Sequence, residues 1–201
     1  PGRQDPESTY KVSPPPADGR KVILADTDHF WGLGGNPEWV WKSFTRGYQT
    51  IFMDLDEPRF PKHVKVDDRE GWNATRRAMG HASALAKRIP LETMRPDTGI
   101  ASSGYCLTNG QSTYVVYLPV DYYGSNQRTV AGRVLRFLFR KEMIKKKVTV
   151  DLSATTTPLV VEWFNVGTGE AVVVGETNGG GSQHFAAPFN GDAVLYLRAT
   201  Q

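Results

Sequence analysis

From Asp97 onward, the sequence consists of short β-rich runs separated by breaks at Gly, Asn and Pro. Short strands at this spacing, with the alternating character seen in Val161-Glu-Trp-Phe, are typical of an antiparallel β-sandwich or barrel. We therefore expect residues 97–201 to form a β-sandwich domain with Trp163 in its core. The predicted strands are Gly99 to Leu107, Thr113 to Leu118, Val148 to Leu152, Leu159 to Asn165, Ala171 to Gly175, Gln183 to Ala187 and Ala193 to Ala199.

The part before this segment follows the order strand, helix, strand. Lys21 to Ala25 is a short continuous apolar run, as expected of a parallel strand buried on both faces. Asn36-Pro37-Glu38 offers an N-cap, a proline at the first helical position and an acid in the first turn. This pattern predicts a helix that runs to Arg46, with Trp39 and Trp41 as core or interface residues. Tyr48 to Met53 then predicts a second buried strand.

The remaining segments differ in composition. Residues 1–20 carry five prolines without apolar periodicity, which predicts an extended or mobile lead-in. Residues 57–69 are expected to be a polar loop. Glu70 to Arg88 has the composition of a long helix that ends before Pro90.

The formal net charge of +3 is unevenly distributed. Residues 121–147 hold eight Lys and Arg against two acids, so this basic insertion carries the positive charge. An apolar face within 128–147 favours a helix there, formed by Val130, Val134, Leu135, Phe137, Leu138 and Ile144. The insertion could attract a polyanion, but it matches no nucleic-acid-binding motif, which makes nucleic acid an unfavoured partner. A solvated helix face packed on its neighbour is the alternative.

Features that the sequence lacks argue against several classes of protein and of site. No apolar run is long enough to span a bilayer, and the first residues do not have the pattern of a secretory signal. A single cysteine, Cys106, excludes an intrachain disulfide framework and a multi-cysteine zinc site, and its flanks indicate a buried thiol. The sequence predicts no cofactor.

Several separated strings carry a resemblance to a known family. ILADTDHFWGLGGNPEWVWKSFTRGYQTIFMD and the following RRAMG resemble the end of the barrel in glycoside-hydrolase-like proteins related to the apiosidase-like family. SSGYCL, YLP, VTVDLS, VEWFNVGTGE and APFNGDAVLYL resemble the small C-terminal β domain of those proteins, which is labelled collagen-binding. The matches cover roughly residues 18–120 and 148–199, and the basic insertion departs from the family pattern.

The resemblance implies an α+β fold, in which residues 21–92 form the terminal part of a (β/α) barrel before the β-sandwich domain. Lys21 to Ala25 and Tyr48 to Met53 would be the seventh and eighth strands. Because reacting groups of barrel enzymes lie at the C-terminal ends of the strands, the active-face candidates are Asp26, Asp28, His29, Trp31, Asp54 and Asp56. The resemblance also implies retaining cleavage of a glycan or polysaccharide, and an extracellular or periplasmic location.

Each candidate has alternatives. Asp26-x-Asp28-His29 could supply the nucleophile and its orienting partners, ligate a cation, or form a capped structural loop. The related barrels usually have Glu at this position, so the match is by position and not by identity. Trp31 could be a sugar-stacking platform, and Asp54 and Asp56 could bind substrate or cap the polar loop.

Chain length limits the function. A complete barrel needs about 250 residues, whereas the predicted barrel segment ends near residue 92. Six strands and the expected strand-four proton donor are therefore absent from this segment, and whether the chain is an enzyme stays open. The first hypothesis is a piece of a carbohydrate-active hydrolase that needs the missing barrel part or another subunit. The second is a non-catalytic binding or assembly module acting through the β domain and the basic insertion.

Overall fold

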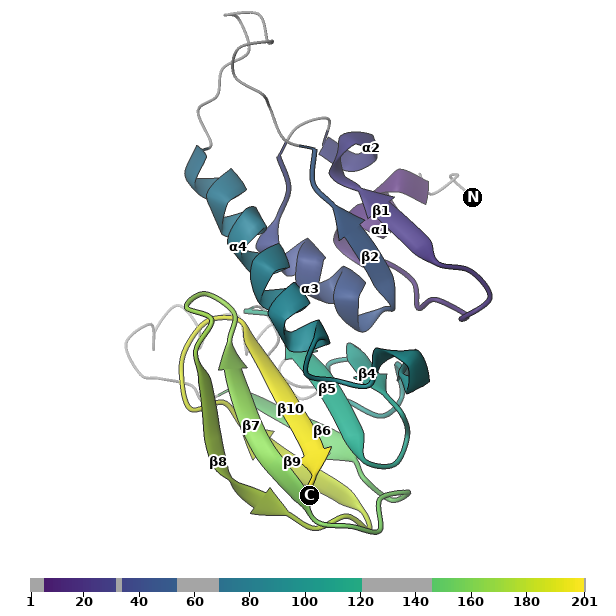
Figure 1. Ribbon diagram of the computed structural model, residues 1–201, viewed down its shortest axis with the longest axis vertical. Helices are drawn as coiled ribbons and strands as arrows, with labels where there is room; N and C mark the ends of the chain where they lie inside the picture. Colours follow the sequence, from purple (N-terminus) through teal and green to yellow (C-terminus); the bar gives the residue numbers. More distant parts are fainter. Residues whose placement is uncertain (1–5, 32–33, 54–68, 121–145, 201) are drawn as a thin grey trace, which may run out of the picture. The chain divides into compact units, whose positions relative to one another are not determined.

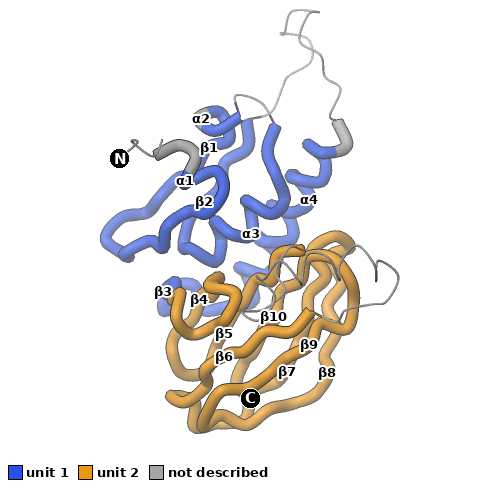
Figure 2. The backbone as a smooth tube through the Cα atoms, turned by 180° about the vertical axis from the view of Figure 1, so that it is seen from behind, with its two compact units in different colours: residues 1–96 blue, residues 97–201 orange. Residues whose placement is uncertain are grey.

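The computed structural model describes residues 6–31, 34–53, 69–120 and 146–200 (Figure 1). The chain divides into two compact units, Pro1–Pro96 and Asp97–Gln201 (Figure 2). Helices and strands mix in the first unit, whereas the described strands of the second unit are antiparallel. None of the described helices is both long and apolar enough to cross a bilayer.

The first unit contains a parallel pair of strands. β1 (Ile23–Asp26) leads into α2 (Thr27–Trp31) and α3 (Pro37–Thr45), and the chain then returns as β2 (Tyr48–Ile51). β1 and β2 pair in parallel. Since parallel strands need a crossover between them, α3 performs the role that the strand–helix–strand pattern predicts.

Both ends of α3 follow from the local sequence. The side chain of Asn36 accepts hydrogen bonds from the backbone N–H groups of Glu38 and Trp39, at 2.8 and 3.3 Å. Pro37 occupies the first helical position, where its missing N–H has no cost. Gly47 follows the helix with a φ of 81°, a left-handed conformation that suits glycine. The predicted helix is confirmed.

Tryptophans of α3 form the core of the first unit. Trp39 is 2% exposed and Trp41 is fully buried, as the sequence predicts. α4 (Arg69–Ala86) packs against α3. Small and aliphatic side chains at helical spacing form the buried face of α4: Ala78, Ala82 and Leu85.

The prediction of an extended lead-in over residues 1–20 is wrong for part of that segment. Pro6–Val12 is a short helix, α1, and it contacts α2. Trp39 donates its indole N–H to the carbonyl oxygen of Tyr10 at 3.2 Å, and the ring of Tyr10 stacks on Tyr48 with centroids 6.1 Å apart. These contacts join residues far apart in sequence, which is why local periodicity gives no sign of α1.

The expectation that the first strand is buried on both faces is also wrong. In β1 only Ala25 is buried, whereas Leu24 is 64% exposed and the preceding Val22 is 79% exposed. On β2, Ile51 is 43% exposed. The described part of this sheet has two strands, so each strand has a hydrogen-bonded neighbour on one side only.

The strands of the second unit belong to two antiparallel sheets. The larger has the order β3-β4-β5-β10-β7-β8, and the smaller pairs β6 with β9. The boundary between the two units falls directly after β3. The strand bounds are β3 Arg95–Pro96, β4 Cys106–Thr108, β5 Thr113–Leu118, β6 Lys147–Asp151, β7 Leu159–Asn165, β8 Ala171–Thr177, β9 Ser182–Ala186 and β10 Ala193–Ala199.

Both sheets contribute to one apolar core. Leu195 lies on the central strand β10, opposite Val116 on one side and Trp163 on the other. Val150 of β6 and Phe185 of β9 join the same cluster from the smaller sheet. Trp163 is 1% exposed, which confirms its predicted core position. Alternate residues along β5, β7 and β10 therefore belong to this core, whereas β8 contributes none.

The predicted bounds of β5, β7 and β10 are confirmed to the residue, but the strand predicted over Gly99 to Leu107 is wrong in most of its length. Only Cys106–Thr108 is a strand there. The Asp97 side chain accepts hydrogen bonds from the N–H groups of Gly99 and Ile100, at 2.8 and 3.3 Å, and so holds the segment in a turn. The predicted helix over 128–147 lies outside the described residues up to 145; Lys146 is not helical, and Lys147 begins β6.

We expect Leu195→Ala to lower the free energy of unfolding by about 2–5 kcal/mol, because it opens a cavity in the core. Val173→Ala on β8 is the control, since Val173 is 58% exposed. Its effect should be about 0.5 kcal/mol or less. Urea unfolding followed by circular dichroism measures both. Equal losses in the two variants would contradict the assigned core.

Cys106 should be unreactive in the folded chain. It is 1% exposed, and burial, followed by the nearby Asp97 charge, raises the pKa of its thiol. Because the thiolate is the reacting form, Ellman's reagent at pH 8 should modify the native chain at least about a hundredfold more slowly than the urea-unfolded chain. Similar rates in the two states would refute this burial.

Candidate functional site

The carboxyl ends of β1 and β2 lie side by side. Asp26, the last residue of β1, is opposite Ile51, the last residue of β2. Asp28 follows in the first turn of α2. Two of the predicted catalytic residues therefore lie at the edge where both parallel strands have their carboxyl ends.

The segment after β1 is a helix, and not the capped loop that is one of the alternatives for Asp26, Asp28 and His29. The carboxylate of Asp26 accepts a hydrogen bond from the backbone N–H of Asp28 at 3.0 Å, next to the start of α2. An aspartate in this position satisfies an N–H group that the helix leaves without an internal partner. Asp26 is half-buried, whereas Asp28 is exposed. Asp26 thus has a structural role that is compatible with a further chemical one.

Thr27 joins the ends of the two strands. It is fully buried, and its hydroxyl oxygen accepts a hydrogen bond from the backbone N–H of Met53 at 2.7 Å. Because Met53 follows β2, this bond fixes the chain after β2 against the chain after β1. The sequence analysis missed Thr27, and its only signal is a threonine between two acids at the end of a strand.

The structure describes the other predicted residues of this edge only in part. Asp54 and Asp56 lie outside the described residues, and so does the side chain of His29, whose backbone belongs to α2. Their roles stay predictions. Within the described ranges, no group of three or more His, Cys, Asp or Glu side chains is arranged to hold a metal ion.

Trp31 ends α2 and belongs to an aromatic cluster. Its ring centroid lies 5.2 Å from that of Trp39 and 5.9 Å from that of Phe30, both in edge-to-face geometry. The Lys11 ammonium lies 4.8 Å from the centroid of the Trp31 ring, a cation–π distance. Trp31 is half-buried. It remains accessible in part, but Lys11 covers one approach to the ring.

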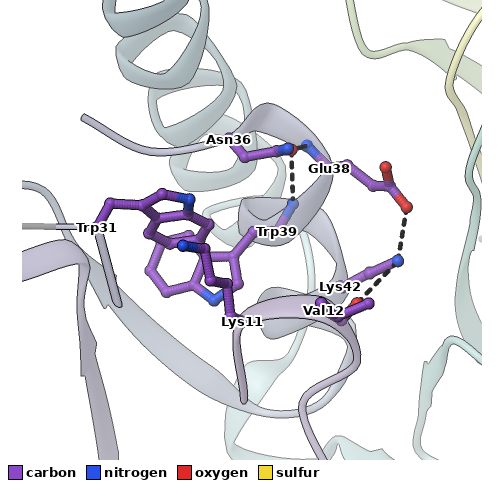
Figure 3. Close-up of a pocket in the computed structure, with 7 residues that line it drawn as sticks. All are labelled: Lys11, Val12, Trp31, Asn36, Glu38, Trp39 and Lys42. Carbon is purple, nitrogen blue, oxygen red and sulfur yellow. Dashed lines mark hydrogen bonds and ion pairs between the residues drawn. The ribbon is translucent and has the colours of Figure 1, made fainter. Parts of the chain in front are cut away.

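A pocket of about 200 Å³ opens beside Trp31 (Figure 3). Its walls come from α1, from the end of α2 and from the first turns of α3, so all of them belong to the first unit. The lining residues are Lys11, Val12, Trp31, Asn36, Glu38, Trp39 and Lys42.

The charged groups of the pocket are held in fixed positions. The ammonium of Lys42 lies 2.5 Å from a carboxylate oxygen of Glu38, one helical turn away, and donates to the carbonyl oxygen of Val12 at 2.9 Å. Lys11 donates to the carbonyl oxygen of Phe30 at 2.9 Å. The two lysines therefore attach α1 to α2 and α3.

Tyr48 has a shifted pKa close to this region. Burial, followed by the adjacent Tyr10 phenol, raises the pKa of Tyr48 to about 12. At neutral pH the phenol is therefore protonated and cannot act as a base. Its role is to stack on Tyr10 and hold α1 in place.

The arrangement has two parts with different chemistry. The edge at Asp26 and Asp28 offers carboxylates that could attack or orient a substrate. The pocket offers an indole, an amide, a carboxylate and ammonium groups, which together can bind a polar ring. Of the pocket residues, only Trp31 is predicted from the sequence as a ligand-binding candidate. Asn36 and Glu38 are predicted as residues of a helix start, and no signal in the sequence indicates Lys11 or Lys42.

No protein-family model and no curated protein matches this sequence. Among solved structures, the chain is similar to one titled "Glycoside hydrolase", with a TM-score of 0.56 and 13% identity over 81% of this chain and 36% of that chain. It is also similar to a glycoside hydrolase family 5 protein from Bacteroides vulgatus ATCC 8482, with a TM-score of 0.54 and 14% identity over 81% and 35%. The chain thus spans about a third of the length of these structures. At such identities the likeness shows a glycoside-hydrolase-like fold and nothing finer.

Thr27→Val should lower the free energy of unfolding by about 1–3 kcal/mol, because the N–H of Met53 loses the acceptor that the buried Thr27 hydroxyl supplies. Thr27→Ser keeps the hydroxyl and should lose less. Thermal and urea unfolding of both variants provide the comparison. If the valine variant were as stable as the serine variant, the hydrogen bond would not hold the strand ends together.

Proposed function

We propose that this chain is the C-terminal part of a glycoside-hydrolase-like, carbohydrate-active protein. In this proposal the first unit supplies the last two strands of a (β/α) barrel, and the second unit is an accessory β-sandwich domain. The likeness to glycoside hydrolase structures supports the fold relation. The substrate would be a glycan or polysaccharide, in keeping with the resemblance of the sequence to secreted enzymes of this kind.

The register of β1 and β2 is the observation that carries the proposal. It aligns the carboxyl ends of two parallel strands and places Asp26 and Asp28 at that edge. Barrel enzymes have their reacting groups at this edge, because side chains fill the barrel interior. Asp26 or Asp28 would be the nucleophile, with His29 as an orienting partner. Trp31, Asp54 and Asp56 would contact the sugar.

Catalysis would need a further part of the barrel. A retaining glycosidase requires a second carboxyl group about 5 Å from the nucleophile to protonate the leaving oxygen. The described residues offer only the edge of β1 and β2. Val22, Leu24 and Ile51 are apolar yet exposed on or beside these strands, as expected where neighbouring strands would cover them. The missing strands would come from the same polypeptide or from another subunit.

A non-catalytic binding or assembly module is the second candidate. Residues 97–201 have their own apolar core, so this unit has the means to fold and bind a partner without the first. The resemblance to domains labelled collagen-binding suggests a polymer as that partner. This candidate predicts polymer binding without any dependence on Asp26 or Asp28.

Substitution of both aspartates distinguishes these candidates. The chain alone should release no sugar from a panel of polysaccharides. When it is co-expressed with the upstream coding sequence that would supply the other strands, hydrolysis should appear. Asp26→Asn with Asp28→Asn should then reduce kcat about a thousandfold or more, because the nucleophile is lost. Asparagine at position 26 keeps the acceptor for the N–H of residue 28.

Asp18→Asn is the matched control, because Asp18 is an exposed acid of the first unit that pairs with Arg20. It should leave hydrolysis unchanged. If the double variant hydrolysed as fast as the wild type, the catalytic assignment would fail. The second candidate is favoured if the chain hydrolyses no polysaccharide, alone or with the upstream part, while both the wild type and the double variant bind a polymer.

A further inference from the structure

The ammonium of Lys11 is a positive charge without an anionic partner in the described structure. Its nitrogen lies 2.9 Å from the carbonyl oxygen of Phe30 and 4.8 Å from the ring centroid of Trp31. A carbonyl and an indole ring are both uncharged acceptors. In the described ranges, Lys11 forms no ion pair with a carboxylate.

The other charges of the same pocket compensate each other. Glu38 pairs with Lys42 at 2.5 Å, one turn along α3. The described residues that line the pocket therefore carry a net positive charge, contributed by Lys11. An ammonium that is half-buried against an aromatic ring has lost part of its hydration, so an added carboxylate would interact with it more strongly than in open water.

The size of the pocket suits a single sugar ring. Its volume is about 200 Å³. Pockets for drug-sized ligands are larger, at about 300–1,000 Å³. The polar lining of Asn36 and Glu38 can exchange hydrogen bonds with ring hydroxyl groups, while Trp31 offers an apolar surface to the C–H groups.

We propose that this pocket binds an acidic pyranose, with the carboxylate of a uronic acid residue paired to the ammonium of Lys11. The inference rests on the proposed carbohydrate function and adds the substrate class. Charge-assisted hydrogen bonds are roughly twice as strong as neutral ones, so the acid group gives the selectivity. In Figure 3, Lys11 and Trp31 lie together at one end of the pocket, and Glu38 and Lys42 lie at the other.

Methyl β-glucuronide and methyl β-glucoside form a matched pair of probes, because they differ only in the carboxylate at C6. Titration of the whole chain, followed by tryptophan fluorescence and by calorimetry, should give at least about tenfold tighter binding of the glucuronide. Raising the salt from 0.05 to 0.5 M should weaken glucuronide binding and leave glucoside binding unchanged, since salt screens partly exposed charges.

Variants of Lys11 then locate the effect. Lys11→Met keeps the length of the side chain and should remove the preference for the glucuronide, whereas Lys11→Arg should retain it. Lys21→Met removes an exposed lysine that does not line the pocket and should have no effect. Circular dichroism confirms that each variant is folded.

Equal binding of the two probes by the wild type would overturn the acidic-sugar proposal and leave the proposed carbohydrate function intact. A preference for glucuronide that persists in Lys11→Met would overturn the assignment to this pocket. Absence of binding for both probes would likewise refute the inference, while the proposed function stands or falls separately on hydrolysis by the complemented barrel.

Discussion

The structure of the first unit depends on the parallel pairing of β1 with β2. This pairing requires a crossover, which α3 provides, and it brings the carboxyl ends of both strands to one edge. The buried hydroxyl of Thr27 then fixes the chain beyond β2 through the N–H of Met53. Both Asp26 and Asp28 owe their common location to this arrangement. The chemistry proposed for the edge is therefore a consequence of strand register, and a slip of β1 against β2 would remove it.

A second set of interactions builds the pocket. The tryptophans of α2 and α3 form a cluster onto which α1 packs through hydrogen bonds to backbone carbonyl groups. Lys11 and Lys42, which make two of these bonds, also line the pocket, and the Lys11 ammonium lies 4.8 Å from the centroid of the Trp31 ring. One of the two charges is compensated by Glu38, and the other is not. Packing and ligand preference thus come from the same side chains.

Sequence reasoning succeeded where local signals decide the structure. The ends of β7 and β10 lie where β-branched and aromatic runs stop at turn residues such as Asn165, and the start of α3 lies at Asn36. It failed where a competing contact, or a contact between residues far apart in the sequence, decides the structure. The Asp97 side chain holds a turn in a run with β propensity, and α1 depends on Trp39 and Tyr48, which lie far along the chain. The pocket combines residues from three helices, so spacing along one helix could not reveal it. The positions of Asp26 and Asp28 could be predicted, because both residues lie in or beside β1.

The central claim is that β1 and β2 are one sector of a larger barrel with its reacting groups at their carboxyl edge. An experimental structure of this chain joined to its upstream coding sequence tests that claim most directly. We expect a third parallel strand on the free edge of β1, burial of Leu24, and a carboxyl group about 5 Å from the carboxylate of Asp26 or Asp28. A structure in which the edge of β1 has no further strand, and in which no carboxyl group approaches either aspartate, would contradict the account.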